Sequence, residues 1–351
     1  MDFDAAIVGG GPAGCAAALT LRSIGHSATV VSDPYGKEKP TETSTPQLNW
    51  LLKELGADSA LAACEPCFGI SAAWGESSPQ IRPAITNPFG NAWFVHRTRF
   101  DLLLQNAVRQ AGAEWISAHV DNISFDPQGV SITTTRETIR ARWFILASGS
   151  PSWTARITMQ KQVVLDSLVG FWAHLPRSLN ARTLFVEATE KGWWYVAPGD
   201  GQGTIGCFVT DGQSVRLLTL SQPANWNELF QSTRICKQLA LEISAQSINK
   251  AFVGLSTLPQ KFGTNWIVAG DAAVKLDPIG SSGLATALAS GQRAAKAVSD
   301  ALKGNHEKLI AYEKWSNALF KEFVRQREQH YEIEAKRRPS DFWTRRLSEA
   351  A

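Results

Sequence analysis

The stretch that most constrains the fold is a glycine-rich turn near the start of the chain, in the sequence AAIVGGGPAG from Ala5 to Gly14. The apolar run before the turn is typical of a parallel strand buried on both faces, and the run from Cys15 to Leu21 predicts a helix. Together the glycines of the turn complete a G-x-G-x-x-G motif. Between a strand and a helix, this motif predicts a dinucleotide site with the pyrophosphate at the helix N-terminus.

The three glycines of the motif have separate expected roles. Gly9 permits the tight turn, and Gly11 lets a pyrophosphate approach the backbone closely. Gly14 lets the helix pack closely on the strand. The helix dipole then places its positive end at the phosphates.

The second predicted strand, Ala28 to Val31, lacks the usual acid at its end. In dinucleotide-binding folds an acidic residue at this point holds the adenosine ribose. Here Ser32 stands in that place and Asp33 follows one residue later. Two alternatives are open: Asp33 reaches back to the ribose, or Ser32 makes a weaker hydrogen bond to it.

The remaining periodicity predicts a discontinuous first domain. Strand-like segments from Asp166 to about Pro259 form a separate sheet, after which the buried strand Trp266–Ala269 and the small-residue helix Leu284–Leu302 return to the first layer. We therefore predict an α/β fold in three parts. These are a nucleotide-binding domain of residues 1–69, 96–165 and 261–303, an inserted mixed β-sheet domain of residues 70–95 and 166–260, and a helical C-terminal region of residues 304–351.

Charge and composition exclude several classes of protein. The net charge of +3 gives no case for nucleic-acid binding. No stretch has the roughly 18 consecutive apolar residues of a membrane span. The five cysteines are scattered and odd in number, which argues against a disulfide framework, and no set of metal ligands accompanies them. We expect a cytoplasmic protein that holds no metal.

Four separated segments resemble one class of flavoenzymes. They are the G-x-G-x-x-G turn, R-x-x-F-D at Arg97–Asp101, the strand end at Ala147–Gly149, and Gly270-Asp271 followed by Asp277-Pro278. Together they resemble the aromatic-hydroxylase class of FAD enzymes, whose architecture flavin-dependent halogenases and geranylgeranyl reductases share. The resemblance implies a Rossmann-like FAD domain of the glutathione-reductase type. It also implies non-covalent FAD, because no His or Cys stands where a covalent tether is expected.

The resemblance also implies roles for individual residues. Arg97 contacts the ribityl–pyrophosphate side of the flavin, and Asp271 accepts hydrogen bonds from the ribityl hydroxyls. An arginine fork suits a pyrophosphate. Pro278 lies against the isoalloxazine, and backbone N–H groups after it face the pyrimidine edge. The predicted cofactor-binding residues are Gly9, Gly11, Pro12, Ala13, Gly14, Ser32, Asp33, Glu42, Thr43, Ser44, Arg97, Gly149, Asp271, Pro278, Gly280, Ser281, Ser282 and Gly283.

The sequence departs from the halogenases at one essential point. Gly192–Pro198 resembles their W-x-W-x-I-P stretch, but the segment Pro66–Ile70, which corresponds to the region of their essential lysine, contains none. A closer resemblance is to halogenase-like flavoproteins that mature quinone-cofactor amine oxidases and dehydrogenases. The shared segments are Ala72–Gly75, Gly192–Tyr195, Gly270–Ala273, Tyr331–Arg337 and Phe342–Arg346.

This second resemblance implies a protein substrate. Such flavoproteins hydroxylate a tryptophan of a partner protein, a step towards tryptophylquinone, so the implied partner is a subunit of a quinone-cofactor amine oxidase or dehydrogenase. We expect the basic C-terminal helices to lie beside the substrate entrance. Charge reversal at Arg345 and Arg346 is then expected to weaken the encounter with the partner.

The implied chemistry is that of a flavin monooxygenase. Reduced FAD binds O₂ and forms a C4a-hydroperoxide, whose distal oxygen attacks an aromatic ring. Electrons come from NAD(P)H or a separate flavin reductase. A small-molecule hydroxylase or halogenase, or a flavin-dependent reductase on the same fold, remains an alternative.

The catalytic residues are not identified by the sequence. Candidates near the ring are Glu42, Pro278, Trp193 and Tyr195, with Trp194 as a further wall of the substrate side. For the aromatic candidates, ordinary core packing is the alternative. A general base is equally open among His96, His174, Glu187 and Asp211.

Overall fold

The computed structural model describes residues 2–34, 39–76, 78–176, 182–200, 203–239 and 245–348. Its first sheet has the strand order β19-β20-β11-β1-β2-β8, with β10 beside β11 and β9 beside β10. The pairs that β1 makes with β11 and β2 are parallel, as are β2–β8 and β11–β20. Its strands are β1 (Phe3–Val8), β2 (Ala28–Ser32), β8 (Glu114–Ser117), β9 (Val120–Asp126), β10 (Gly129–Thr134), β11 (Thr138–Leu146), β19 (Phe262–Gly263) and β20 (Trp266–Val268).

Helices pack on this sheet where the sequence is rich in small residues. The helix α1 (Pro12–Ser23) lies so close to α8 (Gly283–Ala301) that a Cβ atom on Gly291 would come within 2.0 Å of the Ala13 carbonyl oxygen. Ala5, Ala6 and Ile7 of β1 are fully buried, as their wholly apolar run predicts. The helices α2 (Gln47–Glu54), α3 (Arg97–Gln110) and α4 (Pro151–Ile157) complete this part.

The second sheet has the order β17-β13-β16-β15-β14-β5-β6. It is mixed, because β14 pairs with β5 in parallel and the other neighbours are antiparallel. Its strands are β5 (Gly69–Ala73), β6 (Gln80–Pro83), β13 (Leu168–Leu175), β14 (Thr183–Thr189), β15 (Gly192–Pro198), β16 (Thr204–Asp211) and β17 (Asn249–Phe252). The helices α5 (Gly212–Leu218), α6 (Pro223–Gln231) and α7 (Arg234–Leu239) belong to the same part.

Two small sheets lie apart from the large ones. One joins β3 (Glu42–Ser44), β7 (Ala92–Val95) and β4 (Cys64–Cys67), and the other joins β12 (Val163–Val164), β18 (Ser256–Thr257) and β21 (Val274–Lys275). Short 3₁₀ turns are η1 (Asp58–Ala63), η2 (Ala84–Thr86), η3 (Gly270–Ala272) and η4 (Pro278–Gly280).

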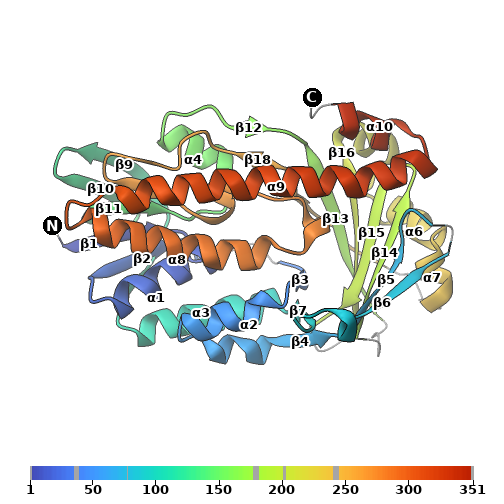
Figure 1. Ribbon diagram of the computed structural model, residues 1–351, viewed down its shortest axis with the longest axis horizontal. Coiled ribbons are helices and arrows are strands. Elements are labelled where there is room, and N and C mark those ends of the chain that lie inside the picture. Colours follow the sequence, from blue (N-terminus) through green and yellow to red (C-terminus); the bar gives the residue numbers. More distant parts are fainter. Residues whose placement is uncertain are drawn as a thin grey trace.

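The C-terminal region is helical. The long helix α9 (Glu307–Arg337) runs along the molecule from the β9–β11 end to the strands β13–β16, and α10 (Asp341–Ser348) follows it there (Figure 1). The predicted class is therefore confirmed: an α/β fold with a parallel sheet, a second mixed sheet and a helical C-terminus. No helix in the described ranges is both long and apolar enough to cross a lipid bilayer.

Candidate functional site

The glycine turn after β1 has the geometry that its motif predicts. Gly9 has φ +116°, and a Cβ atom there would lie 2.2 Å from the Ala147 carbonyl oxygen. A Cβ atom on Gly14 would lie 1.8 Å from the Gly9 carbonyl oxygen, so this glycine allows the helix to approach the strand. At Gly11 a Cβ atom would meet no atom within 4 Å. The backbone at Gly11 is therefore open to a ligand. At Gly9 and Gly14, by contrast, other protein atoms occupy the space that a side chain would need.

The first turn of α1 is suited to phosphate. The helix begins at Pro12 after Gly11, which makes no side-chain cap, and its first turn carries no acidic residue. Its N–H groups are thus not capped by a side chain and face no carboxylate within that turn. Such a helix terminus favours an anion.

At the end of β2, the two candidate ribose residues face different surroundings. A Cβ atom on Gly10 would lie 2.6 Å from the Ser32 hydroxyl oxygen, so Ser32 lies against the glycine turn. The Asp33 carboxylate pairs with the His119 ring at 3.1 Å, and both side chains are exposed. Ser32 is the nearer of the two to the turn, and its role towards a ribose remains a prediction.

Arg97 is buried at the start of α3 and is held by two carboxylates. Its Nε and Nη2 atoms both donate to Asp101 at 3.1 Å, and Nη1 donates to Glu42 at 2.5 Å. Burial alone lowers the pKa of Arg97, but Glu42 and Asp101 outweigh it and raise the pKa above the ordinary value. Three of the five N–H donors are used, which leaves two for a ligand. The sequence indicated Arg97 and Glu42 separately but not the orienting role of Asp101, although the i,i+4 spacing was visible.

Glu42 begins β3, and the predicted neighbours Thr43 and Ser44 follow it in the same strand. This strand pairs with β7, whose Val95 lies opposite Glu42. The Ser44 hydroxyl is buried and has no hydrogen-bond partner in the described structure.

Asp271 lies in the turn η3 directly after β20. Two hydroxyl groups hold this turn in place. The Gly270 N–H donates to the Ser290 hydroxyl at 2.9 Å. The Tyr312 hydroxyl lies 2.8 Å from the Ser290 hydroxyl and donates to the Val268 carbonyl at 2.7 Å. Sequence reasoning missed both hydroxyls. They come from α8 and α9, about 20 and 40 residues further on, and nothing local marks them.

The Asp271 carboxylate faces the charged groups predicted to share the site. Its nearest cation is the Lys275 ammonium, at 3.8 Å. Burial raises the pKa of Asp271 and the Glu42 carboxylate raises it further, while Lys275 and Arg97 act in the opposite direction. The side chain keeps 41% of its surface accessible, so solvent moderates this shift. Glu42 and Arg97 therefore both act electrostatically on Asp271, and the flavin-binding roles that the resemblance implies for Arg97 and Asp271 remain predictions.

The loop Asp277–Gly283 follows β21, contains the turn η4 and leads into α8. The Asp277 carboxylate accepts from the Ile279 N–H at 3.0 Å and caps the turn that contains Pro278. Ser281 is a non-glycine residue with φ +47°, a conformation that marks local strain. The Ser282 hydroxyl is buried without a hydrogen-bond partner among the described residues. At Gly283, as at Gly149, a Cβ atom would meet nothing within 4 Å.

The aromatic candidates on β15 divide between two faces, as strand geometry requires. Trp193 and Tyr195 share one face, with ring centroids 6.3 Å apart. Tyr195 lies opposite Cys207 and hydrogen-bonds to it. Burial raises the pKa of Tyr195 well above its normal value, with Cys207 and Glu42 adding to the effect, so the phenol stays protonated.

Trp194 does not wall the substrate side. It points to the opposite face of the sheet, where it packs on Trp226 at 5.0 Å and Phe230 at 4.9 Å. The expectation that all three aromatics share one wall was wrong, because neighbouring residues of a strand face opposite ways. For Trp194, core packing is the correct interpretation.

Four of the five segments that carry the second resemblance, all except Gly270–Ala273, meet in one aromatic cluster. Trp74 packs on Trp193 at 6.3 Å, on Tyr331 at 6.0 Å and on Trp343 at 5.2 Å. The Trp74 indole N–H also donates to the His330 carbonyl at 2.8 Å. The cluster joins β5 and β15 to α9 and α10, so these motifs fasten the C-terminal helices to the second sheet.

Two of the four candidate general bases have structural partners instead. The Glu187 carboxylate accepts from the Arg234 and Ile235 N–H groups, both at 2.9 Å to Oε2, at the start of α7. Asp211 caps α5 by accepting from the Ser214 N–H at 2.9 Å. Both carboxylates are thus engaged by backbone donors that hold helix starts in place. The His96 ring lies between Thr41 and Glu65, each at 3.2 Å.

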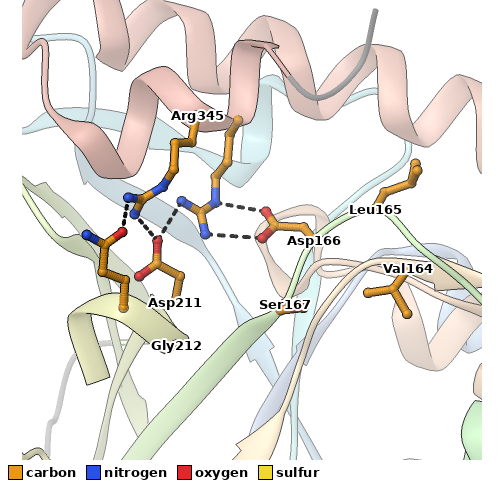
Figure 2. Close-up of a pocket in the computed structure, with 9 residues that line it drawn as sticks. Val164, Leu165, Asp166, Ser167, Asp211, Gly212 and Arg345 are labelled. Carbon is orange, nitrogen blue, oxygen red and sulfur yellow. Dashed lines mark hydrogen bonds and ion pairs between the residues drawn. The ribbon is translucent and has the colours of Figure 1, made fainter. Parts of the chain in front are cut away.

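A cavity of about 530 Å³ lies beside α10 and is lined by ion pairs (Figure 2). Arg345 donates to Asp211 at 2.6 Å, and Arg346 contacts both Asp211 at 3.2 Å and Asp166 at 2.8 Å. Arg346 is 3% exposed and Arg345 36%. The expectation that both arginines face a partner is therefore corrected: Arg346 neutralises buried carboxylates, and reversing its charge would destabilise the fold itself.

Among the described residues, no cluster of three or more His, Cys, Asp or Glu side chains is arranged to hold a metal ion. The residues around the glycine turn do fit a dinucleotide. The open backbone at Gly11, the buried and unpartnered Ser282 hydroxyl and the accessible Asp271 carboxylate offer the donor and acceptor set that phosphates and a polyol need.

Comparison with known proteins agrees with this arrangement. The chain is 25% identical to the putative FAD-dependent oxidoreductase LodB of Marinomonas mediterranea, over 98% of this chain and 96% of that protein. It is 24% identical to the flavin-dependent halogenase armH2 of Armillaria mellea, over 91% of this chain and 70% of the halogenase. The chain is thus similar over most of its length to FAD-dependent oxidoreductases and flavin-dependent halogenases.

The chain also matches a protein-family model and several solved structures. The profile of the lycopene cyclase protein family matches residues 4–178. Among solved structures, the peptidyl tryptophan dihydroxylase QhpG superposes with a TM-score of 0.79 and 20% identity, over 99% of this chain and 79% of that one. The flavin-dependent halogenase CmlS superposes with a TM-score of 0.85 and 21% identity, over 99% and 68%. The predicted fold and the predicted class of flavin-dependent oxidoreductase are confirmed.

Proposed function

We propose that this protein is an FAD-dependent monooxygenase that hydroxylates a tryptophan side chain of a partner protein during biogenesis of a protein-derived quinone cofactor. The observation that carries the proposal is the aromatic cluster of Trp74, Trp193, Tyr331 and Trp343. Each comes from a segment that resembles the quinone-maturing flavoproteins, and in space these segments form one unit. The likeness to a solved peptidyl tryptophan dihydroxylase supports the same interpretation.

FAD is expected to bind along the residues already described. The pyrophosphate belongs at Gly11 and the N-terminus of α1, with the two unused donors of Arg97 beside it. Asp271 accepts from the ribityl hydroxyls, and the backbone from Gly280 to Gly283 donates to the flavin ring system. When bound and reduced, FAD supplies the activation of O₂. The binding is non-covalent in this proposal.

The protein's own contribution is to hold and shield an aromatic ring. Tyr195 presents a protonated phenol on the β15 face that carries Trp193. Glu42 forms an ion pair with Arg97 at 2.5 Å, which holds its side chain in place beside the predicted flavin site. An apolar, aromatic wall excludes water from a reactive oxygen donor. Trp193 and Tyr195 thus position the ring, and Pro278 lies on the flavin side of it.

Halogenation is the competing activity, since several relatives are halogenases. Against it, the segment Pro66–Ile70 contains no lysine to direct a hypohalous acid. Its Cys67 thiol is buried and donates to the Gly69 carbonyl at 3.2 Å. Hydroxylation is therefore the preferred proposal.

The decisive experiment is co-expression with a candidate partner, a subunit of a quinone-cofactor amine oxidase or dehydrogenase. We expect the intact mass of the partner to rise by about 16 Da per oxygen atom inserted, on a tryptophan, only when the flavoprotein can bind FAD. Free tryptophan should react very poorly, because it lacks the remote contacts that a protein substrate supplies. Efficient turnover of free indoles or phenols with no mass change on the partner would contradict the proposal, and halide incorporation would favour the halogenase.

A further inference from the structure

One face of α9 lies against the loop Asp277–Gly283. Phe323, Arg327 and Tyr331 are spaced four residues apart, so they lie on the same side of the helix. A Cβ atom on Gly280 would lie 2.7 Å from the Phe323 ring, which places that part of the loop directly on α9. The Arg327 Nε atom and the Tyr331 hydroxyl both donate to the Asp277 carboxylate, each at 2.7 Å.

The Asp277 carboxylate links these two α9 side chains to the backbone of the loop. One of its oxygens accepts from Arg327 and Tyr331, and the other accepts from the Ile279 N–H at 3.0 Å. The carboxylate is 1% exposed. A buried carboxylate that loses its cation is costly, so the position of the loop depends on the arginine.

The same arginine also holds the second sheet. Its Nη2 atom donates to Asp166, two residues before β13 begins. Arg346 of α10 contacts the same carboxylate at 2.8 and 3.1 Å, and Figure 2 shows Asp166 and Asp211 at this end of the network. Arg327 therefore bridges Asp277 in the predicted flavin loop and Asp166, which lies just before β13 of the second sheet.

The charges of this bridge remain fixed. Burial alone lowers the pKa of Arg327, but Tyr331, Asp277 and Asp166 outweigh it and raise the pKa above the ordinary value. Burial and the Asp277 carboxylate raise the pKa of Tyr331 far above its usual range. The guanidinium thus keeps its charge and the phenol its proton, and both act as permanent donors to Asp277.

We propose that Arg327 is a positioning residue for the flavin: by gripping Asp277 and Asp166 together, it fixes the Asp277–Gly283 loop relative to β13. Because of this link, the loop keeps a fixed position relative to the second sheet. The inference rests on the proposed function in one respect, that this loop contacts the flavin.

The test compares Arg327→Gln with Arg325→Gln. Arg325 lies on the same helix, is exposed, and pairs locally with Glu322 at 2.7 Å, so its variant is a matched control. We expect R327Q to weaken FAD binding about ten-fold or more and to change the visible spectrum of the bound flavin, as loss of a hydrogen bond to a charged group should. R325Q should match the unmodified protein in both readouts. Equal FAD affinity and equal spectra for the two variants would overturn the proposal.

Two gentler variants keep the test meaningful should R327Q fail to fold. Tyr331→Phe removes one donor to Asp277 without changing the ring, and Arg327→Lys keeps the charge but not the fork. Both should shift the flavin spectrum and lower FAD affinity less than R327Q does. Asp166→Asn should also shift the spectrum, although Asp166 contacts Arg327 and not the loop. Unchanged spectra in Y331F and D166N would refute the bridge.

These readouts separate the inference from the proposed function. Asp271→Ala should weaken FAD binding whether or not Arg327 acts through the loop. If D271A loses FAD while the Arg327, Tyr331 and Asp166 variants behave like R325Q, only the positioning role fails. If D271A retains FAD fully, the flavin site itself is misplaced and the proposed function fails with it.

Discussion

Asp271 is the single side chain on which the cofactor prediction depends most directly. Its carboxylate is accessible and forms an ion pair with Lys275 at 3.8 Å, and its turn is held by the Ser290 and Tyr312 hydroxyls. Replacing it by alanine should weaken FAD binding by about 1–3 kcal/mol, since a ribityl hydroxyl would lose its acceptor. Equilibrium dialysis against FAD measures this, with the exposed Asp121→Ala as control. Equal retention by both variants would show that the carboxylate does not serve the flavin.

Lys261 gives a prediction about pH. Its ammonium is fully buried and donates to the Thr257 hydroxyl at 2.9 Å and to the Leu258 carbonyl. Burial lowers the pKa of Lys261 from 10.5 to about 8, with Glu313 opposing the shift. Above the folded-state pKa, the unfolded chain binds more protons than the folded one, so this residue makes stability rise with pH.

The measurement is the free energy of unfolding in urea between pH 8 and 10.5. The contribution of Lys261 should rise through this window by up to about 1.4 kcal/mol per pH unit, and Lys261→Met should lack that increase. A variant that follows the same pH dependence as the unmodified protein would show that the ammonium is not desolvated.

At this scale, residue roles that depend on local geometry were predictable and the others were not. The different constraints on Gly9, Gly11 and Gly14 follow from the motif, and the structure reproduces them. The grip of Arg327 on Asp277 joins residues 50 positions apart, and no periodicity in the sequence connects them. The direction of Trp194 was available from strand alternation, yet the resemblance to a halogenase motif drew attention to the wrong face.

At the scale of elements, the turn between β5 and β6 depends on one glycine. Gly75 has φ +71°, and a Cβ atom there would lie 2.3 Å from the Ile333 side chain of α9. Its N–H donates to the buried Glu334 carboxylate at 2.7 Å. The turn is therefore pinned to α9 both by contact and by a charge-assisted hydrogen bond.

This geometry gives a prediction with a close control. Gly75→Ala should lower the free energy of unfolding by about 2–4 kcal/mol, because it adds a clash to the strain of a positive φ. Gly25→Ala, at φ +89° with nothing within 4 Å of the added atom, should cost only the strain, about 1 kcal/mol. Chemical denaturation measures both, and equal losses would show that α9 moves freely away from the added methyl group.

Elements themselves were largely readable from the sequence. The buried strands β1 and β20 follow from wholly apolar runs, and α8 follows from its small residues. Which face of α9 is buried was less readable, since Arg327 and Glu334 are charged residues at core positions. Charged residues on a helix normally indicate a solvated face. The groups that pair with Arg327 and Glu334 lie in loops far away in the sequence, so the burial of these two residues could not be predicted.

For the whole molecule, the sequence and fold give a prediction about which electron donor reduces the flavin. The second G-x-G-x-x-G of the sequence, Gly201–Gly206, leads into the strand β16 and not into a helix, so it lacks the strand–turn–helix setting of a nucleotide site. The strand end before Gly149 carries Ser148 and so offers no charged group there. We therefore predict slow direct reduction by NADH or NADPH, and reduction at ordinary rates only with a separate flavin reductase. Anaerobic stopped-flow absorbance of the bound flavin measures this. Fast reduction by either nucleotide alone would contradict it.

The strand order was beyond sequence reasoning. β1 near the N-terminus lies between β2 and β11, and β20 joins the same sheet from residues 266–268. Parallel pairing over such separations leaves no mark in the local pattern; only the resemblance to a known architecture indicated it. The same holds for the parallel pairing of β5 with β14 in the second sheet, which joins strands more than 100 residues apart in the sequence.

The placement of Phe342, Trp343 and Arg346 has a consequence for biosynthesis. They cover one face of β13, β15 and β16 and supply a cation to Asp166 and Asp211, yet the ribosome adds them after every strand that they cover. While the chain is being made, that aromatic face stays bare and both carboxylates lack Arg346. The nascent second sheet is thus most prone to aggregation just before α10 emerges, and a fusion that delays α10 would lengthen that interval.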